Sequence, residues 1–163
     1  MQIPMQLNSL ASALQAAQTL VDLATKDAEA QSEIRDEEEI QQLQEAYGKG
    51  ATGRGMASGA SKAVKELEKE QKARATRLVR DSIDAALLDL ASFYRDILLV
   101  QSGSPDSLIN SDLQNEVNQL ASSSTSKSTT LKIDAILKTR SQLTQNSAPL
   151  LICEALMCEL ARK

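Results

Sequence analysis

The sequence has no histidine and no tryptophan, and only three of its 163 residues are aromatic. Without histidine, a Ser-His-Asp triad, a Cys-His nucleophilic pair and any histidine-containing zinc site are excluded. The two cysteines alone cannot complete a structural zinc shell. We therefore expect no catalytic residue, no metal site, no cofactor and no small-molecule substrate, and we predict that the chain is not an enzyme.

The sequence also lacks a long apolar run. No stretch approaches the roughly 18 apolar residues needed to cross a membrane, and MQIPMQLNSL has no signal-peptide pattern. Cys153 and Cys158 lie about 140° apart around an expected helix, too far for a disulfide. Free, reduced thiols are typical of the cytoplasm, where we expect the protein to be. The abrupt start at Ile3-Pro4 is typical of a cut inside a longer protein.

Alanine, leucine, glutamine, glutamate and serine dominate the composition, which favours helices over strands. The length fits one domain over 1–163. Apolar residues from Leu7 to Ala28 follow a 3-4 spacing, and a second stripe flanks the first, which predicts a helix with a wide apolar face. Its polar continuation to Tyr47 is either the same helix or a second one after a break near residues 30–33.

Five of the six glycines fall within residues 48–59, where no core helix can persist. The string GKGATG matches GxGxxG, but a polar helix precedes it instead of an apolar strand, so the segment predicts a flexible loop and no nucleotide site. Ser61 then begins the longest periodic segment, which ends at Gly103 and Pro105. Its first half is expected to be exposed, and its second half to be the central core helix.

Three shorter helices are expected beyond it. Ser111 and Gln114 form a capping box for the first, SSSTSKSTT is expected to be a loop, and TLKIDAILKTRSQLTQN is amphipathic. Ser147 is expected to cap the last helix, which has Pro149 in its first turn and is apolar nearly all round. The sequence therefore predicts an all-α bundle of five to six helices with one long central helix.

The charge is modest overall but unevenly distributed. A formal net charge of −4 argues against nucleic-acid binding by the chain as a whole. An acidic run at residues 27–45 is followed by a basic-leaning run at residues 62–80. We interpret these runs as two solvated helix faces that lie against each other, with a basic docking strip for nucleic acid as the alternative.

Four strings, taken in order, carry a resemblance to a known family. They are ASFYRDILLVQSG from Ala91, LIN from Leu108, RSQLTQN from Arg140 and LLICEALM from Leu150. Together they resemble the C-terminal collar domain of the bacterial clamp-loader delta-prime subunit of DNA polymerase III. The resemblance is to the actinobacterial form, which has a charged long helix after a Gly-rich insertion, and it covers nearly the whole chain.

The resemblance implies a heteropentameric loader in which a ring of collar helices holds the subunits together while a sliding clamp is placed on primer-template DNA. The AAA+ domains would lie upstream and are absent from this chain. The implied partners are the gamma/tau and delta subunits, bound through collar helices, with DNA met only through the assembled loader. The parent complex would be the DNA polymerase III holoenzyme, a DNA-directed DNA polymerase.

Seven residues are candidates for an interface or a helix junction. Phe93, Tyr94 and Leu98 would anchor a partner if they point outward, and would hold the core together if they point inward. Arg140 lies on an apolar helix face, where its guanidinium needs acceptors from Glu154 or from carbonyls that end a neighbouring helix. The full set is Phe93, Tyr94, Arg95, Leu98, Arg140, Asn146 and Glu154.

A second hypothesis is a helical adaptor or coiled-coil interaction module unrelated to replication. The stripe from Leu7 to Ala28 would then be a dimer seam. Sustained heptads would favour this hypothesis, but they end after Ala28.

Overall fold

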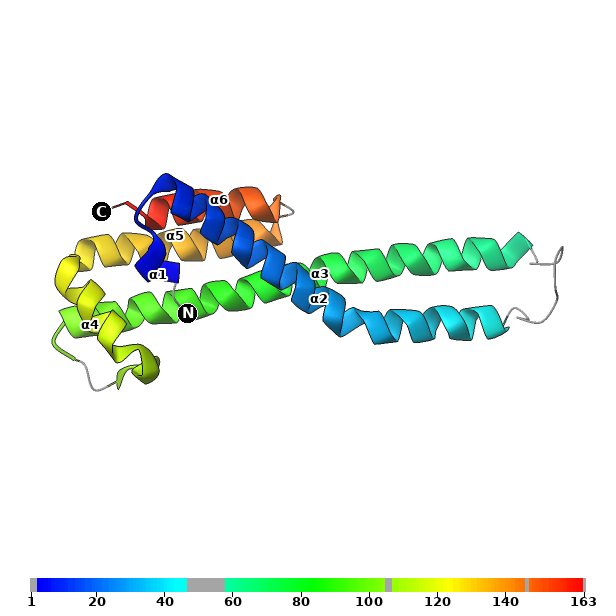
Figure 1. Ribbon diagram of the computed structural model, residues 1–163, viewed down its shortest axis with the longest axis horizontal. Coiled ribbons are helices and arrows are strands. Elements are labelled where there is room, and N and C mark those ends of the chain that lie inside the picture. Colours follow the sequence, from blue (N-terminus) through cyan, green and yellow to red (C-terminus); the bar gives the residue numbers. More distant parts are fainter. Residues whose placement is uncertain (1–2, 47–57, 105–106, 146, 163) are drawn as a thin grey trace. The chain divides into compact units, whose positions relative to one another are not determined.

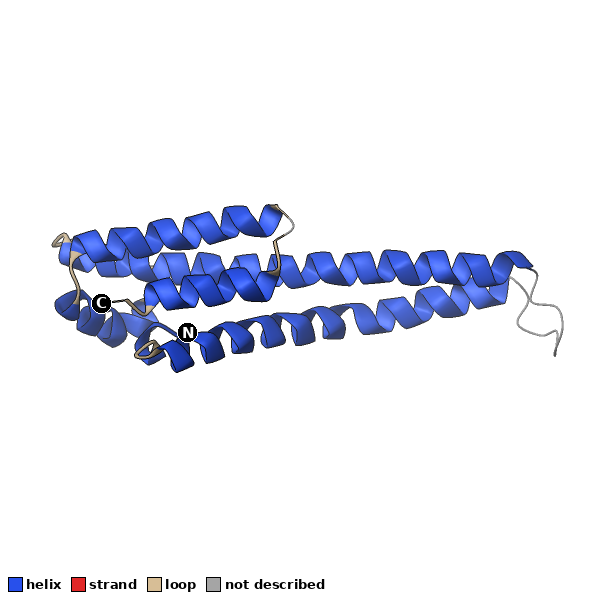
Figure 2. Cartoon of the chain, turned by 90° about the horizontal axis from the view of Figure 1, so that it is seen from above, coloured by secondary structure: helices blue, strands red, loops and turns tan. Residues whose placement is uncertain are grey.

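Helices account for nearly all of the described chain (Figure 1 and Figure 2). The computed structural model describes residues 3–46, 58–104, 107–145 and 147–162. No strand occurs in these ranges, so the predicted all-α fold with a long helix is confirmed. The helices are α1 (Ile3–Gln6), α2 (Leu10–Ala46), α3 (Ser58–Gln101), the 3₁₀ turn η2 (Ser111–Leu113), α4 (Gln114–Ser123), α5 (Ser126–Thr144) and α6 (Pro149–Leu160).

The chain divides into two compact units. The first, here called the bundle, comprises Met1–Asp22 and Ile83–Lys163, and the second, called the hairpin, comprises Leu23–Ser82. Helices α2 and α3 each contribute residues to both units. A single domain over 1–163 stays a prediction. So does the flexible loop at 48–59, most of which lies outside the described residues.

Helix α2 begins at a serine cap and continues without the break that was considered near residues 30–33. The Ser9 hydroxyl accepts a hydrogen bond from the Ser12 amide at 3.1 Å, and the Ser12 hydroxyl accepts one from the Ser9 amide at 3.0 Å. These reciprocal bonds satisfy backbone donors at the helix start, as a capping box does. The sequence left open whether this segment forms one helix or two, and the structure shows one continuous helix.

The buried face of α2 in the bundle is narrower than predicted and consists mainly of alanine. Ala13 and Ala17 are fully buried and Leu20 is 8% exposed, whereas Leu10 and Leu14 are 66% and 40% exposed. These buried residues come from both predicted stripes. Their mostly small side chains let the neighbouring helices approach closely. Leu10 and Leu14 of the first stripe therefore add to the exposed apolar surface of α2.

Helix α3 begins at Ser58, earlier than predicted, and ends at a glycine, as predicted. Gly103 has a φ of 76°, in the left-handed region that favours glycine. The amide of Ser104 donates to the carbonyl of Leu99 at 3.0 Å, and the amide of Gly103 donates to the carbonyl of Val100 at 3.1 Å. These two bonds form a Schellman cap, which satisfies the last carbonyls and stops the helix.

The serine-rich segment that was predicted to be a loop is mostly helical, so this prediction was wrong. Helix α4 extends to Ser123 and α5 begins at Ser126. The hydroxyl of Thr125 accepts a hydrogen bond from the Ser128 amide at 3.2 Å and caps α5. Several neighbouring hydroxyls donate to carbonyls one turn earlier, which accommodates serine and threonine inside helices.

Two further helix starts differ from the prediction. Ser111 lies inside η2, ahead of α4, and the predicted capping box with Gln114 is absent. Helix α6 begins at Pro149, so its cap position falls on Ala148 instead of Ser147. Because the residue before a proline is held in extended backbone, Ala148 adopts φ −66° and ψ 116° and provides no side-chain cap.

The core of the bundle is mainly aliphatic, and α2, α3, α5 and α6 contribute most of it. Ile83, Leu87 and Leu90 follow one face of α3 and are each at most 1% exposed. Ile136 of α5 and Met157 of α6 are fully buried as well. Figure 1 shows α5 beside α3 and α6 beside α5. The second half of α3 is thus the core helix that the sequence predicts.

The acidic and basic runs meet in the hairpin around Arg74. Its guanidinium donates to Asp36 Oδ1 and to Glu39 Oε2, each at 2.6 Å. Glu39 also accepts from Arg35 at 2.8 Å, and Gln71 donates to the backbone carbonyl of Asp36 at 2.9 Å. Hydrogen bonds from Arg74 and Arg35 lower the pKa of Glu39 to about 2. Polar groups at a helix seam fix the register of the pair, and we assign that role to this cluster.

Candidate assembly surface

Phe93 and Tyr94, the adjacent aromatics of α3, face the core of the bundle. They are 1% and 4% exposed, and their rings lie 6.1 Å apart at an interplanar angle of 85°. The ammonium of Lys132 lies 5.8 Å from the centre of the Tyr94 ring. Burial raises the pKa of Tyr94 to about 12. Of the two predicted roles for Phe93 and Tyr94, the structure supports the one in which they point inward and hold the core together.

Arg140 pairs with Asp84, 56 positions away in the sequence. Its Nε and Nη2 atoms donate to the two carboxylate oxygens at 2.7 Å and 2.9 Å, which is the bidentate geometry that guanidinium groups favour. These hydrogen bonds lower the pKa of Asp84 and raise that of Arg140. The sequence predicts Glu154 or helix-end carbonyls as acceptors for Arg140. The observed acceptor is the carboxylate of Asp84 on α3.

Asp96 is a buried carboxylate that holds the segment before η2, and sequence reasoning missed this role. Its side chain is fully buried and accepts from the Ile109 amide at 3.2 Å and from the Asn110 amide at 2.7 Å. It also accepts from Asn110 Nδ2 at 2.8 Å and from Arg95 at 3.0 Å. Burial alone would raise the pKa of Asp96, but the bonds from Asn110 and Ile109 and the charge of Arg95 outweigh it, so the pKa is lowered.

Three of the other candidates differ in their exposure to solvent. Arg95 is exposed, and Leu98 and Glu154 are half-buried. Asn146 lies outside the described residues. The interface or junction roles of the seven candidates stay predictions.

Both cysteines are free, as predicted. Cys153 is buried, and burial raises the pKa of its thiol to about 11, so the thiolate is scarce at neutral pH. Cys158 is half-buried. Cys153 is therefore a core residue of α6.

Two exposed leucines lie one helical turn from the ion pair between Asp84 and Arg140, toward the same end of the helix pair. Leu88 follows Asp84 by one turn of α3 and is 46% exposed, and Leu137 precedes Arg140 by one turn of α5 and is 48% exposed. Because α3 and α5 lie side by side in opposite directions (Figure 1), both leucines lie at the same edge of this helix contact. We call the surface made by Leu88, Leu137, Asp84 and Arg140 the α3–α5 face.

The sequence contains one signal that could have revealed this face. Asp84 and Arg140 are charged residues one turn from a leucine on the same helix, and such residues mark the edge of a buried stripe. Reading them as a pair would have required knowing that α3 and α5 are neighbours.

Neither a membrane helix nor a metal site is found in the described ranges. None of the helices there is long and apolar enough to cross a membrane. No group of three or more acidic or cysteine side chains in those ranges could hold a metal ion. The described residues form an all-α protein with exposed leucines on its helices.

Residues 64–160 match the family described as DNA polymerase III, delta subunit, C terminal. The match covers more than half of the chain and includes all of α4 and α5 and the whole of α6. The chain therefore belongs to this family, and its role is related to the clamp loader of DNA polymerase III. No curated protein and no solved structure matches the chain. The predicted clamp-loader relationship is confirmed at the level of the family, whereas the delta-prime assignment stays a prediction.

Proposed function

We propose that the bundle is a collar domain, which holds clamp-loader subunits together through contacts between helix faces. Membership of the family supports association with other clamp-loader subunits. The observation that carries the proposal is the α3–α5 face, where two leucines about half exposed lie one helical turn from a bidentate ion pair. Grouped apolar side chains on a surface mark interfaces more often than isolated ones do. In this role the domain contributes binding surface and no reaction step.

The α3–α5 face has the layout of an interface centre with a polar edge. A contact of ordinary size buries on the order of 800 Å² per partner, and a few side chains supply most of its energy. Leu88 and Leu137 would supply the apolar centre. The guanidinium of Arg140 is already oriented by Asp84, so it would lose little side-chain freedom when a partner binds.

The proposed partners are the collar domains of gamma/tau and delta, and the proposed place in the ring is that of delta-prime in an actinobacterial-type loader. The resemblance of the strings from Ala91 to Met157 supports delta-prime, while the matching family is that of the delta subunit. A competition experiment separates the two. Added to a loader assembled from collar fragments, the chain is expected to displace delta-prime, and displacement of delta would assign it to the delta position instead.

Placing aspartate at both exposed leucines is expected to break the association. Leu88→Asp combined with Leu137→Asp puts two charges at the centre of the proposed contact, so affinity for gamma/tau collar fragments is expected to fall at least about tenfold. The free energy of unfolding should change little, because both positions are about half exposed in the isolated chain. Sedimentation of the mixed proteins measures the association, and denaturant unfolding measures the stability.

The matched control carries the same two charges elsewhere. Leu131 is 57% exposed on α5, about 120° around the axis from Leu137, and Ile34 is 71% exposed in the hairpin. Leu131→Asp combined with Ile34→Asp should therefore bind like the wild type. Equal binding by both double variants would show that the α3–α5 face is not the contact. A folded wild-type chain that binds no collar fragment at tens of micromolar would contradict the collar proposal itself.

A further inference from the structure

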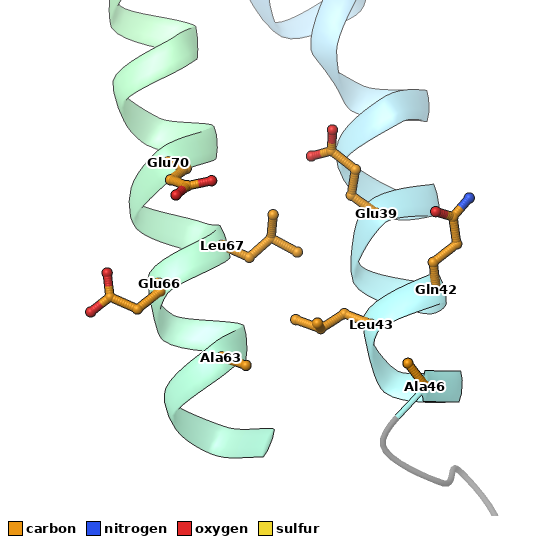
Figure 3. A pocket seen from close by; sticks show the side chains of 8 residues that line it. All are labelled: Glu39, Gln42, Leu43, Ala46, Ala63, Glu66, Leu67 and Glu70. Carbon is orange, nitrogen blue, oxygen red and sulfur yellow. The ribbon is translucent and has the colours of Figure 1, made fainter. Parts of the chain in front are cut away.

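The two helices of the hairpin leave an open apolar groove next to the Arg74 cluster. The groove has a volume of about 550 Å³, and its apolar lining consists of Leu43 and Ala46 of α2 and Ala63 and Leu67 of α3. The two leucines point toward one another across it (Figure 3). Both leucine side chains are only half-buried. In a closed helix seam, neighbouring side chains normally cover a pair of facing leucines. The apolar layer is therefore incomplete at this point.

The polar lining of the groove is acidic. Glu39, Glu66 and Glu70 contribute carboxylates, and no lysine or arginine lines the groove. Glu39 is already bound by Arg74 and Arg35. Glu66 and Glu70 are exposed, and no residue in the described ranges forms a salt bridge with either of them. Both carboxylates thus lack a salt bridge in the described ranges, and the side chain of Glu66 points away from α2 (Figure 3).

We propose that this groove binds an amphipathic helix of a partner protein that carries large aliphatic side chains on one face and lysine or arginine beside them. A third helix laid along the hairpin completes the layer begun by Leu43 and Leu67, as in a small helical bundle. Basic side chains flanking its apolar stripe pair with Glu66 and Glu70. A second copy of this chain fits less well, because its net charge of −4 would bring more negative charge to an acidic groove.

This binding site is separate from the proposed collar contact. The groove lies in the hairpin, whereas the α3–α5 face lies in the bundle. Its α2 lining and Ala63 also lie outside the segment that matches the delta-subunit family. Loss of binding at the groove and loss of collar association are therefore measured on different surfaces, and either proposal can fail alone.

The test uses the whole chain and a synthetic probe. The probe is an amphipathic helix of about three heptads with leucine on one face and flanking lysines, and its counterpart carries glutamate in place of lysine. Fluorescence anisotropy is expected to show binding of the lysine probe and not of the glutamate probe. Glu66→Gln combined with Glu70→Gln is expected to weaken lysine-probe binding about tenfold, since each pair at a partly screened site contributes modestly.

The matched control removes two carboxylates that do not line the groove. Glu68 of α3 and Glu38 of α2 are exposed, so Glu68→Gln combined with Glu38→Gln should leave the affinity unchanged. Methyl resonances of Leu43 and Leu67 should shift when the lysine probe is added. Equal weakening in both double variants, or shifts confined to leucines of the bundle, would overturn the proposal. Self-association of the chain that is lost with Glu66→Gln and Glu70→Gln would assign the groove to a second copy instead.

Discussion

Replacing Phe93 with alanine is expected to lower the free energy of unfolding by about 3–5 kcal/mol, because removal of a buried ring leaves a cavity that the core fills only in part. Phe93 is 1% exposed and packs edge-on against Tyr94. Circular dichroism in increasing denaturant measures the change. The expected defect is unfolding of the bundle and not the simple loss of a partner.

The control for this experiment is an alanine on the other side of the same helix. Leu88 is 46% exposed, so Leu88→Ala should cost less than about 1 kcal/mol. The two variants therefore separate a residue that holds the core from one that is available to a partner. If Phe93→Ala were no more harmful than Leu88→Ala, Phe93 would not be a core residue of the folded chain in solution.

Replacing Asp96 with asparagine is expected to lower the free energy of unfolding by about 3 kcal/mol, although the shape of the side chain hardly changes. The carboxylate accepts hydrogen bonds from Ile109, Asn110 and Arg95. An amide at this position would turn one acceptor into a donor that faces other donors. Because the lost bonds tie the segment before η2 to α3, we expect that segment to exchange its amide hydrogens faster in the variant.

The same carboxylate makes the stability dependent on pH. The pKa of Asp96 is lowered from 3.8, its ordinary value, so the folded state favours the charged form. The stabilisation from this group is therefore complete above pH about 4 and is lost as the pH falls through the lower pKa of the folded state. The free energy of unfolding of the wild-type chain should fall below pH about 4. This fall should be smaller in Asp96→Asn.

Asp89 provides the comparison for the stability measurement at neutral pH. It is an exposed aspartate on the same helix, so Asp89→Asn should leave the free energy of unfolding within about 0.5 kcal/mol of the wild type at neutral pH. Similar behaviour of Asp96→Asn and Asp89→Asn would mean that the hydrogen bonds of Asp96 contribute little to the fold.

Much of the local structure could be predicted from the sequence. The period of the apolar residues indicates α3, α5 and α6, and the glycine at position 103 marks the end of α3. These features depend on interactions within a few residues, namely backbone hydrogen bonds, helix capping and the preference of glycine for positive φ. The serine-rich segment was predicted wrongly because serine and threonine hydroxyls also bond to carbonyls one turn earlier inside a helix, and composition alone does not distinguish the two uses.

The candidate site shows where prediction from the sequence stopped. Arg140 was expected to need acceptors, and this requirement follows from the chemistry of a guanidinium on an apolar face. Its actual partner, Asp84, is supplied by a helix 56 positions away. Leu88 and Leu137 could not be recognised as neighbours for the same reason, since only the packing of α3 against α5 brings them to one edge.

The amino-acid sequence by itself determined that this protein is helical, where most of its helices lie and that it resembles a clamp-loader subunit, because helical period, caps and motif order are local properties of the chain. Only the tertiary structure decided that the buried face of α2 consists mainly of alanine, that Asp96 is a buried acceptor, and that the hairpin has an open acidic groove. Those outcomes depend on which helix faces approach each other and how closely. They follow from packing between segments distant in sequence, about which a local pattern holds no information.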